Sequence, residues 1–153
     1  MKFYRLLCLL GLLVAFTGCE SISDRVMERF DPAPLQSRPF AASHATVYAA
    51  AQKALKRMDF MVTRSALAQG IVNARSGQRD TAKFGSSRQF LIEVHLRAID
   101  DGHTEVGLRL SELLEGDFKA GATEKTIAKH GLYDSFYEQL TQALREAALG
   151  AKP

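Results

Sequence analysis

The sequence predicts an α+β domain, in which an antiparallel sheet of about four strands carries an N-terminal and a C-terminal helix on one face. Apolar residues recur at helical spacing over residues 43–58 and 133–147, and they alternate with polar residues over residues 90–110. Two amphipathic helices and a half-apolar sheet bury these surfaces best when both helices cover the same face.

The first helix is expected to begin after Ser43, whose side chain can cap the first turn, and to run to Arg57. Two short strands, over residues 60–65 and 71–75, are expected to follow. Their apolar residues do not alternate cleanly, so their pairing register is weakly specified.

Residues 90–99 and 104–110 read as a hairpin whose apolar residues all have even numbers. Opposed residues share a face, so their numbers sum to an even total, and a loop over residues 100–102 with Gly102 in the left-handed conformation satisfies this condition. The register then pairs Ile92 with Leu110, Val94 with Leu108 and Leu96 with Val106, and on the other face Glu93 with Arg109 and Arg97 with Glu105. Residues 113–123 read as irregular chain before the last helix.

The N-terminus is typical of an export signal, with Lys2 and Arg5 ahead of an apolar stretch over residues 6–16. That stretch is too short to cross a bilayer. The chain has 20 basic and 17 acidic residues, and residues 1–18 contain two of the basic ones and no acid. Much of the net charge of +3 therefore belongs to the predicted signal peptide.

Phe16, Thr17, Gly18 and Cys19 resemble the lipobox of bacterial lipoproteins. The resemblance implies that the Cys19 thiol receives a diacylglycerol, that the chain is cut before it, and that the new amine is acylated, for example with palmitate. Because Glu20 stands where an inner-membrane retention signal usually has Asp, it also implies the periplasmic face of the outer membrane. Several acyl chains hold a protein on a bilayer firmly.

Three segments follow from these patterns. Residues 1–18 are the expected signal peptide, and residues 19–40, which hold three of the four prolines, are the expected lipidated tether. Residues 41–150 are expected to form one periplasmic domain.

The sequence offers no group suited to catalysis. Cys8 would leave with the signal peptide and Cys19 would be acylated, which removes both thiols. No histidine pair has metal-ligand spacing, and neither a nucleophile elbow nor a phosphate-binding glycine loop occurs. We therefore expect no enzyme, no metal and no cofactor, and solvated surface histidines at His44, His95, His103 and His130.

Residues 77–89 read as a flexible basic loop and a candidate interaction site. Its residues, with the arginine just before it, are Arg75, Arg79, Lys83, Phe84 and Arg88. Such a loop could engage anionic lipid headgroups, peptidoglycan carboxylates or an acidic protein. Alternatively, its cations serve only solubility. It lacks the aromatic platform on which nucleic-acid bases stack, so no nucleic-acid partner is expected.

Residues 43–144 resemble small lipoproteins of Gram-negative outer membranes, and their plan is similar to the repeated domains of a lipoprotein in the β-barrel assembly machinery. The matching segments are VYAAAQKALKRMDFMVTRS, GIVNA, the hairpin around residues 99–106 and LYDSFYEQL. The resemblance implies a non-enzymatic role in the envelope, as a lipid-anchored binding or scaffold module. The alternative is a carrier that holds a small apolar ligand or lipid between helices and sheet.

Overall fold

The structure, a computed structural model, describes residues 34–80, 86–116 and 122–150. The predicted signal peptide, Cys19, residues 20–33 of the tether, Lys83 and Phe84 lie outside these residues. The elements in chain order are β1 (Gln36–Phe40), α3 (His44–Arg57), β2 (Met61–Ala66), a 3-10 turn η1 (Leu67–Gln69), β3 (Ile71–Arg75), β4 (Arg79–Asp80), β5 (Ser86–Ala98), β6 (Thr104–Gly116), β7 (Thr123–Thr126) and α4 (Gly131–Gly150).

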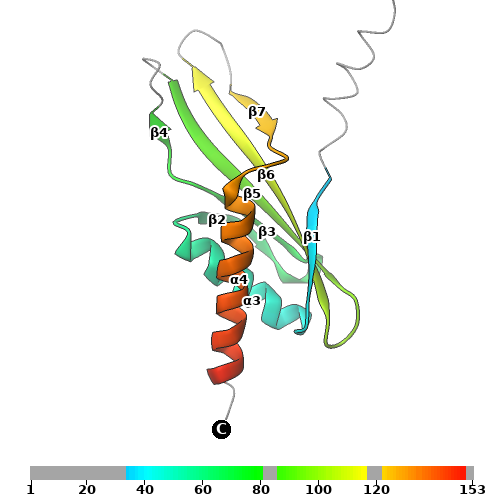
Figure 1. The fold of residues 1–153 in the computed structure, drawn as a ribbon. Helices are drawn as coiled ribbons and strands as arrows, with labels where there is room; N and C mark the ends of the chain where they lie inside the picture. The colour runs from blue at the N-terminus through cyan, green and yellow to red at the C-terminus, as the bar shows by residue number, and fades with distance from the viewer. Residues whose placement is uncertain (1–33, 81–85, 117–121, 151–153) are drawn as a thin grey trace, which may run out of the picture. The chain divides into compact units, whose positions relative to one another are not determined.

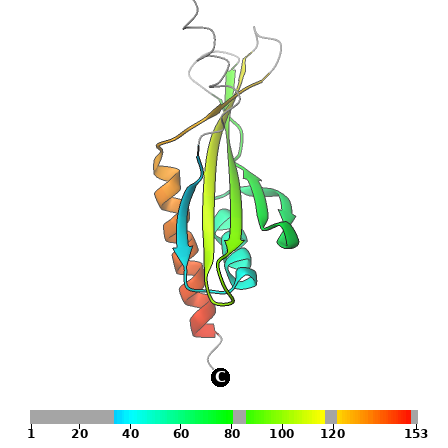
Figure 2. The same ribbon diagram turned by 90° about the vertical axis from the view of Figure 1, so that its right-hand side faces the viewer.

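All seven strands join one antiparallel sheet in the order β1-β6-β5-β3-β2, with β4 paired to β5 and β7 paired to β6. The two long strands β5 and β6, of 13 residues each, run the length of the domain (Figures 1 and 2). Near the hairpin loop the pair lies between β1 and β3, and its far end is flanked by β4 and β7.

The predicted sheet of about four strands with an N-terminal helix is wrong. Strand β1 precedes α3, so α3 lies between strands and the domain has a C-terminal helix but no N-terminal one within the described residues. The prolines predicted an extended segment here, and β1 is extended, but it also pairs with β6. Pro39 is compatible with this strand because β1 lies at the edge of the sheet, where a residue without an N–H can face solvent and no hydrogen bond to a neighbouring strand is lost.

Two further strands escaped the sequence patterns because they are too short to show an alternation. Strand β4 has two residues and β7 has four. Residues 111–116 also continue β6 into the predicted irregular stretch. These segments are strands because the neighbouring long strand offers them hydrogen-bond partners.

The predicted hairpin register between β5 and β6 is confirmed at all five positions, from Ile92 opposite Leu110 to Arg97 opposite Glu105. The loop over residues 100–102 closes with a bond from the Ile99 N–H to the His103 carbonyl at 2.9 Å. The predicted left-handed conformation of Gly102 is wrong, because no positive φ is found there. Instead, the Asp100 carboxylate accepts from the Gly102 N–H at 2.8 Å and lies 2.9 Å from the His103 ring nitrogen. The His103 contact lowers the pKa of Asp100.

The core lies between the sheet and the two helices, which pack on each other and on the same face. Helix α3 begins at the predicted cap, where the Ser43 hydroxyl accepts from the Thr46 N–H at 3.4 Å. Even-numbered residues of β5 and β6 face the helices. The largest fully buried side chains are Phe136, Leu55, Ile92, Leu108, Leu110 and Leu140.

Candidate functional site

The long β5–β6 pair continues past the first turn of α4, where no helix of the described part covers it (Figures 1 and 2). We call this portion the ribbon end. It consists of residues 86–90 and 112–116 with strands β4 and β7. It contains most of the described residues of the segment that the sequence predicted to be a basic loop.

The structure brings two of the predicted interaction residues together and separates a third. Arg79 in β4 lies directly opposite Arg88 in β5, so both side chains share one face of the sheet. Arg75 ends β3 opposite Leu91, on the other face. The described ends of the predicted flexible loop are therefore paired strands, whose two arginines lie together while Arg75 is separate from them.

The ribbon end has opposite charges on its two sides. On the side facing the helix layer, which we call the helix side, the register places Arg79, Arg88 and Lys125 with the single carboxylate Glu112. The opposite side carries Asp80, Glu115 and Glu124 and no cation among the described residues of the ribbon end. The alternation of a strand thus sorts an almost neutral stretch of sequence into a basic side and an acidic side.

The facing arginines are not explained by the stability of the fold. Like charges directly opposite each other destabilise a strand pair. Arg88 is partly compensated, since its Nε lies 3.1 Å from Glu112 Oε1, whereas Arg79 makes no ion pair with any described residue. A local rule broken without an evident structural gain is a common mark of a functional surface.

An exposed apolar side chain completes this side of the ribbon end. Leu114 lies directly opposite Arg88 and is 40% exposed. Thr123 of β7 is opposite Leu114 and is also exposed. The helix side therefore combines cations with a leucine that neither helix covers.

The base of the ribbon end is held against the start of α4 by contacts that the sequence did not reveal. The His130 ring lies 5.2 Å from that of Phe90, and its Nδ1 accepts from the Leu132 N–H at 3.1 Å. The Tyr133 hydroxyl donates to the Ile127 carbonyl at 2.7 Å and accepts from the Leu110 N–H at 3.2 Å. A histidine just before the helix was the signal that could have indicated a cap.

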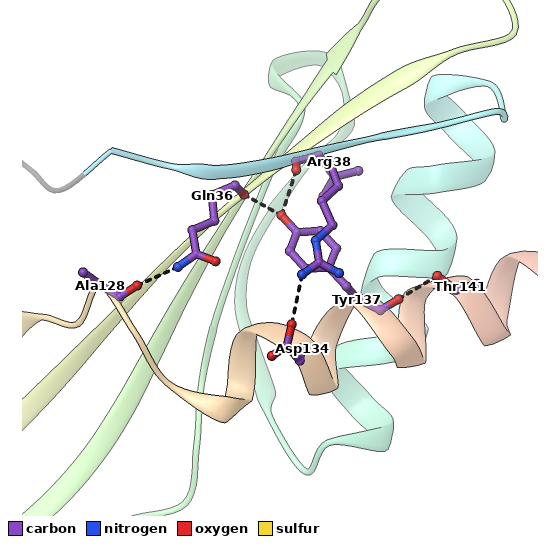
Figure 3. A network of polar contacts seen from close by, with 7 residues as sticks. Gln36, Arg38, Ala128, Asp134, Tyr137 and Thr141 are labelled. Atoms are coloured by element: carbon purple, nitrogen blue, oxygen red, sulfur yellow. Dashed lines mark hydrogen bonds and ion pairs between the residues drawn. The ribbon is translucent and has the colours of Figure 1, made fainter.

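A second network ties β1, which forms the last residues of the predicted tether, to α4 (Figure 3). The buried Tyr137 hydroxyl donates to the carbonyls of Gln36 and Val106. The Arg38 guanidinium lies 4.3 Å above the Tyr137 ring and 2.9 Å from an Asp134 oxygen. Burial raises the pKa of Tyr137 well above its usual range, so the phenol stays neutral and keeps donating.

Two other features lie away from the ribbon end. An open groove of about 230 Å³ between α3 and α4 is lined mostly by alanines and bordered by Lys53 and Glu146. On the helix-free face of the sheet, Asn73 Oδ1 and His95 Nε2 are buried and have no hydrogen-bond partner within the described residues, and His95 Nε2 lies 3.6 Å from Glu93 Oε2. Among the described residues, no group of three or more His, Cys, Asp and Glu side chains is placed to hold a metal ion.

The described part of the chain contains no helix that is long and apolar enough to span a bilayer. No family model and no curated protein matches the sequence. Among solved structures, the chain is similar to the adenylate sensor from AMP-activated protein kinase in complex with 5-aminoimidazole-4-carboxamide 1-beta-D-ribofuranotide. The likeness covers 70% of this chain and 93% of that chain at 14% identity and a TM-score of 0.43, and a likeness of this size carries no conclusion about fold or ligand.

Proposed function

We propose that this protein is a lipid-anchored periplasmic domain of the Gram-negative envelope, held at the outer membrane through Cys19, that acts as a non-enzymatic binding or scaffold module. The observation that carries the proposal is the ribbon end, where Arg79 and Arg88 face each other beyond the helix layer. The similarity in plan to the repeated domains of a lipoprotein in the β-barrel assembly machinery is part of the same proposal.

The ribbon end supports a binding role because the core does not require it. The largest buried side chains of β5 and β6 lie between Ile92 and Leu110, closer to the hairpin loop than the ribbon end. A projection with opposite charges on its two sides can select partners by electrostatic complementarity. We expect the contacts of this domain with another envelope component, be it lipid, protein or peptidoglycan, to begin there.

The alternative, a carrier of a small apolar ligand, requires a pocket, and the candidate is the groove between α3 and α4. Its volume of about 230 Å³ lies below the range of roughly 300–1,000 Å³ that is usual for ligand pockets, and the groove is open to solvent. The space between helices and sheet is filled by a contiguous cluster that includes Phe136, Leu55 and Ile92, each at most 2% exposed. Both observations support the scaffold over the carrier.

The anchor is tested by replacing Cys19 with Ser in cells. We expect acyl labelling to disappear in this variant. In a second variant, the Cys19→Ser protein also carries a signal peptide that the general signal peptidase can cleave. We expect this processed variant to leave the membrane fraction. Membrane association that stays unchanged in that processed variant would contradict the anchor.

The binding role is tested with a photo-crosslinking amino acid at Thr123, on the helix side of the ribbon end, in intact cells. The control carries the same amino acid at Glu138, which is also exposed but lies on α4. We expect protein or lipid adducts at Thr123 and few at Glu138. Equal labelling would contradict the role of the ribbon end, and a stoichiometric lipid extracted from the purified protein would favour the carrier.

A further inference from the structure

We infer that the helix side of the ribbon end rests against the anionic phospholipid headgroups of the same membrane that holds the lipid anchor. This inference depends on the proposed anchoring through Cys19 and names the partner of the ribbon end. It assigns the domain an orientation, with the ribbon end at the bilayer and the hairpin loop of residues 100–102 away from it.

The direction of β1 is the first argument. Strand β1 is antiparallel to β6, with Gln36 opposite Leu108 and Phe40 opposite Thr104. Strand β6 runs from Thr104 to Gly116 at the ribbon end. Strand β1 therefore begins at its end nearer to the ribbon end and runs toward the hairpin loop (Figure 1). The point at which the predicted tether enters the sheet is thus the end of β1 that lies nearer to the ribbon end.

The length of the tether is the second argument. The part of the tether that precedes β1, residues 19–35, can span at most roughly 60 Å when fully extended. The stretch of β6 from Leu108 to Gly116 spans roughly 25 Å. The tether can therefore let the ribbon end touch the bilayer and still hold it close to the bilayer. Tethering raises the effective concentration of membrane surface at the ribbon end, so weak contacts are sufficient.

The arrangement of charge is the third argument. Cationic side chains near an anionic bilayer are each attracted to it, and an apolar residue among them can enter the headgroup region. The helix side provides Arg79, Arg88 and Lys125 around Leu114. The opposite side carries three carboxylates, which a negative surface would repel. An acidic protein could bind the same cations. The tether, however, gives the bilayer a higher effective concentration at these cations than a freely diffusing protein has.

The test uses the mature, lipidated protein in vesicles of phosphatidylethanolamine with phosphatidylglycerol, and in vesicles of phosphatidylcholine. An introduced cysteine would be the only free thiol, and a fluorophore is attached to it at Thr123→Cys or at Ser87→Cys. Ser87 is one ladder position farther from the hairpin loop than Thr123, but it lies on the acidic side of the ribbon end. Quenching by headgroup spin labels then reports which side meets the lipid.

We expect stronger quenching at Thr123→Cys than at Ser87→Cys, only in the vesicles with phosphatidylglycerol, and less of it at 1 M salt, where the screening length falls to about 3 Å. Equal quenching at both sites, or quenching that is unaffected by lipid charge, would overturn the inference. Vesicle flotation of the same samples checks the anchor separately. Protein that floats without quenching refutes the orientation alone, whereas protein that fails to float refutes the anchor.

Two arginine variants make a matched pair. Arg79→Glu reverses a charge on the helix side and leaves a favourable pairing with Arg88 across the ladder, so the fold is preserved. Arg75→Glu makes the same change in net charge on the opposite face. We expect Arg79→Glu to lower the ratio of lipid-bound to free ribbon end, measured by quenching at Thr123→Cys, by roughly tenfold. We expect Arg75→Glu to leave this ratio nearly unchanged. Equal effects would overturn the inference. Protein crosslinks at Thr123 in cells without quenching in vesicles would assign the surface to an acidic protein instead.

Discussion

Replacing Tyr137 with Phe should loosen β1, the strand that the last residues of the predicted tether form at the edge of the sheet. The hydroxyl donates to the carbonyls of Gln36 in β1 and Val106 in β6, and the side chain is only 2% exposed. Water cannot easily replace the lost donor. The ring remains, so the Arg38 guanidinium keeps its stacking partner.

The expected cost is about 1–3 kcal/mol in the free energy of unfolding, the usual penalty for leaving buried polar groups without a partner. For a domain of this size, that corresponds to a fall in melting temperature of roughly 4–12 °C. Because the lost bonds join β1 to α4, amide hydrogen exchange should rise most in β1.

Urea unfolding gives the stability change, and hydrogen exchange shows where it acts. The matched control is Tyr48→Phe, which removes a hydroxyl whose partner is the Ser65 hydroxyl, between α3 and β2. That variant should leave exchange in β1 unchanged. A Tyr137→Phe variant as stable as wild type, or one in which exchange rises no more in β1 than in β2, would refute the reasoning.

The same hydroxyl predicts the alkaline limit of stability. Burial raises the pKa of Tyr137 above its ordinary value of 10.0, so folding favours the neutral phenol. This contribution is complete below pH 10 and is lost as the pH rises further toward the folded-state value. The Phe variant should lack this part of the alkaline decline when stability is measured across pH.

Three further predictions concern the fold. Gly70→Ala should destabilise the domain by more than about 2 kcal/mol in urea unfolding, because Gly70 has φ +63 and an added Cβ would lie 2.2 Å from the Leu96 carbonyl oxygen. The control Gly131→Ala, with nothing within 4 Å of its added Cβ, should change the free energy of unfolding by less than about 1 kcal/mol. Equal effects of the two variants would contradict the steric argument. Hydrogen bonds from Arg57 and Lys53 lower the pKa of Glu146 from 4.5 to about 2, so its contribution to stability is present above pH 4.5 and lost as the pH falls toward 2. Glu146→Gln should therefore show a shallower acid decline, and an unchanged slope would count against the cross-helix pair. Arg97→Glu and Glu105→Arg, made singly and together, should show a coupling of about 0.2–1 kcal/mol across their 2.7 Å ion pair, and strict additivity would argue against it.

Both helices and the central hairpin could be predicted because each carries its own periodic pattern. The even-numbered apolar residues from Ile92 to Leu110 exclude a slip of one residue, which would turn every one of them to the wrong face, and the two pairs of opposite charges agree with the observed register. Strand β1 could not be predicted in this way. Its sequence QSRPF has no alternation, and its ladder partners lie far along the chain, from Thr104 to Leu108.

The candidate site shows the same limit. The basic residues around Arg79 and Arg88 were evident in the sequence, but the irregular stretch between the elements gave no register from which to assign a face. Arg75 lies only four residues before Arg79, yet it faces the other side, because it belongs to the β3 ladder and Arg79 to the β4 ladder. The contacts of Tyr137 with β1 were likewise hidden, because they join residues that are distant in the chain.

By itself, the sequence determined the features that depend on nearest neighbours along the chain: the apolar stripes of the two helices, the cap at Ser43, the hairpin register and the lipobox-like run at Cys19. Only the tertiary structure decided that β1 completes one edge of the sheet, that short strands extend the other end, and that the charges there separate into a basic and an acidic side. The physical reason is that a strand pair needs partners from distant segments, and the face on which a charge lies is set by that pairing and not by the charge itself.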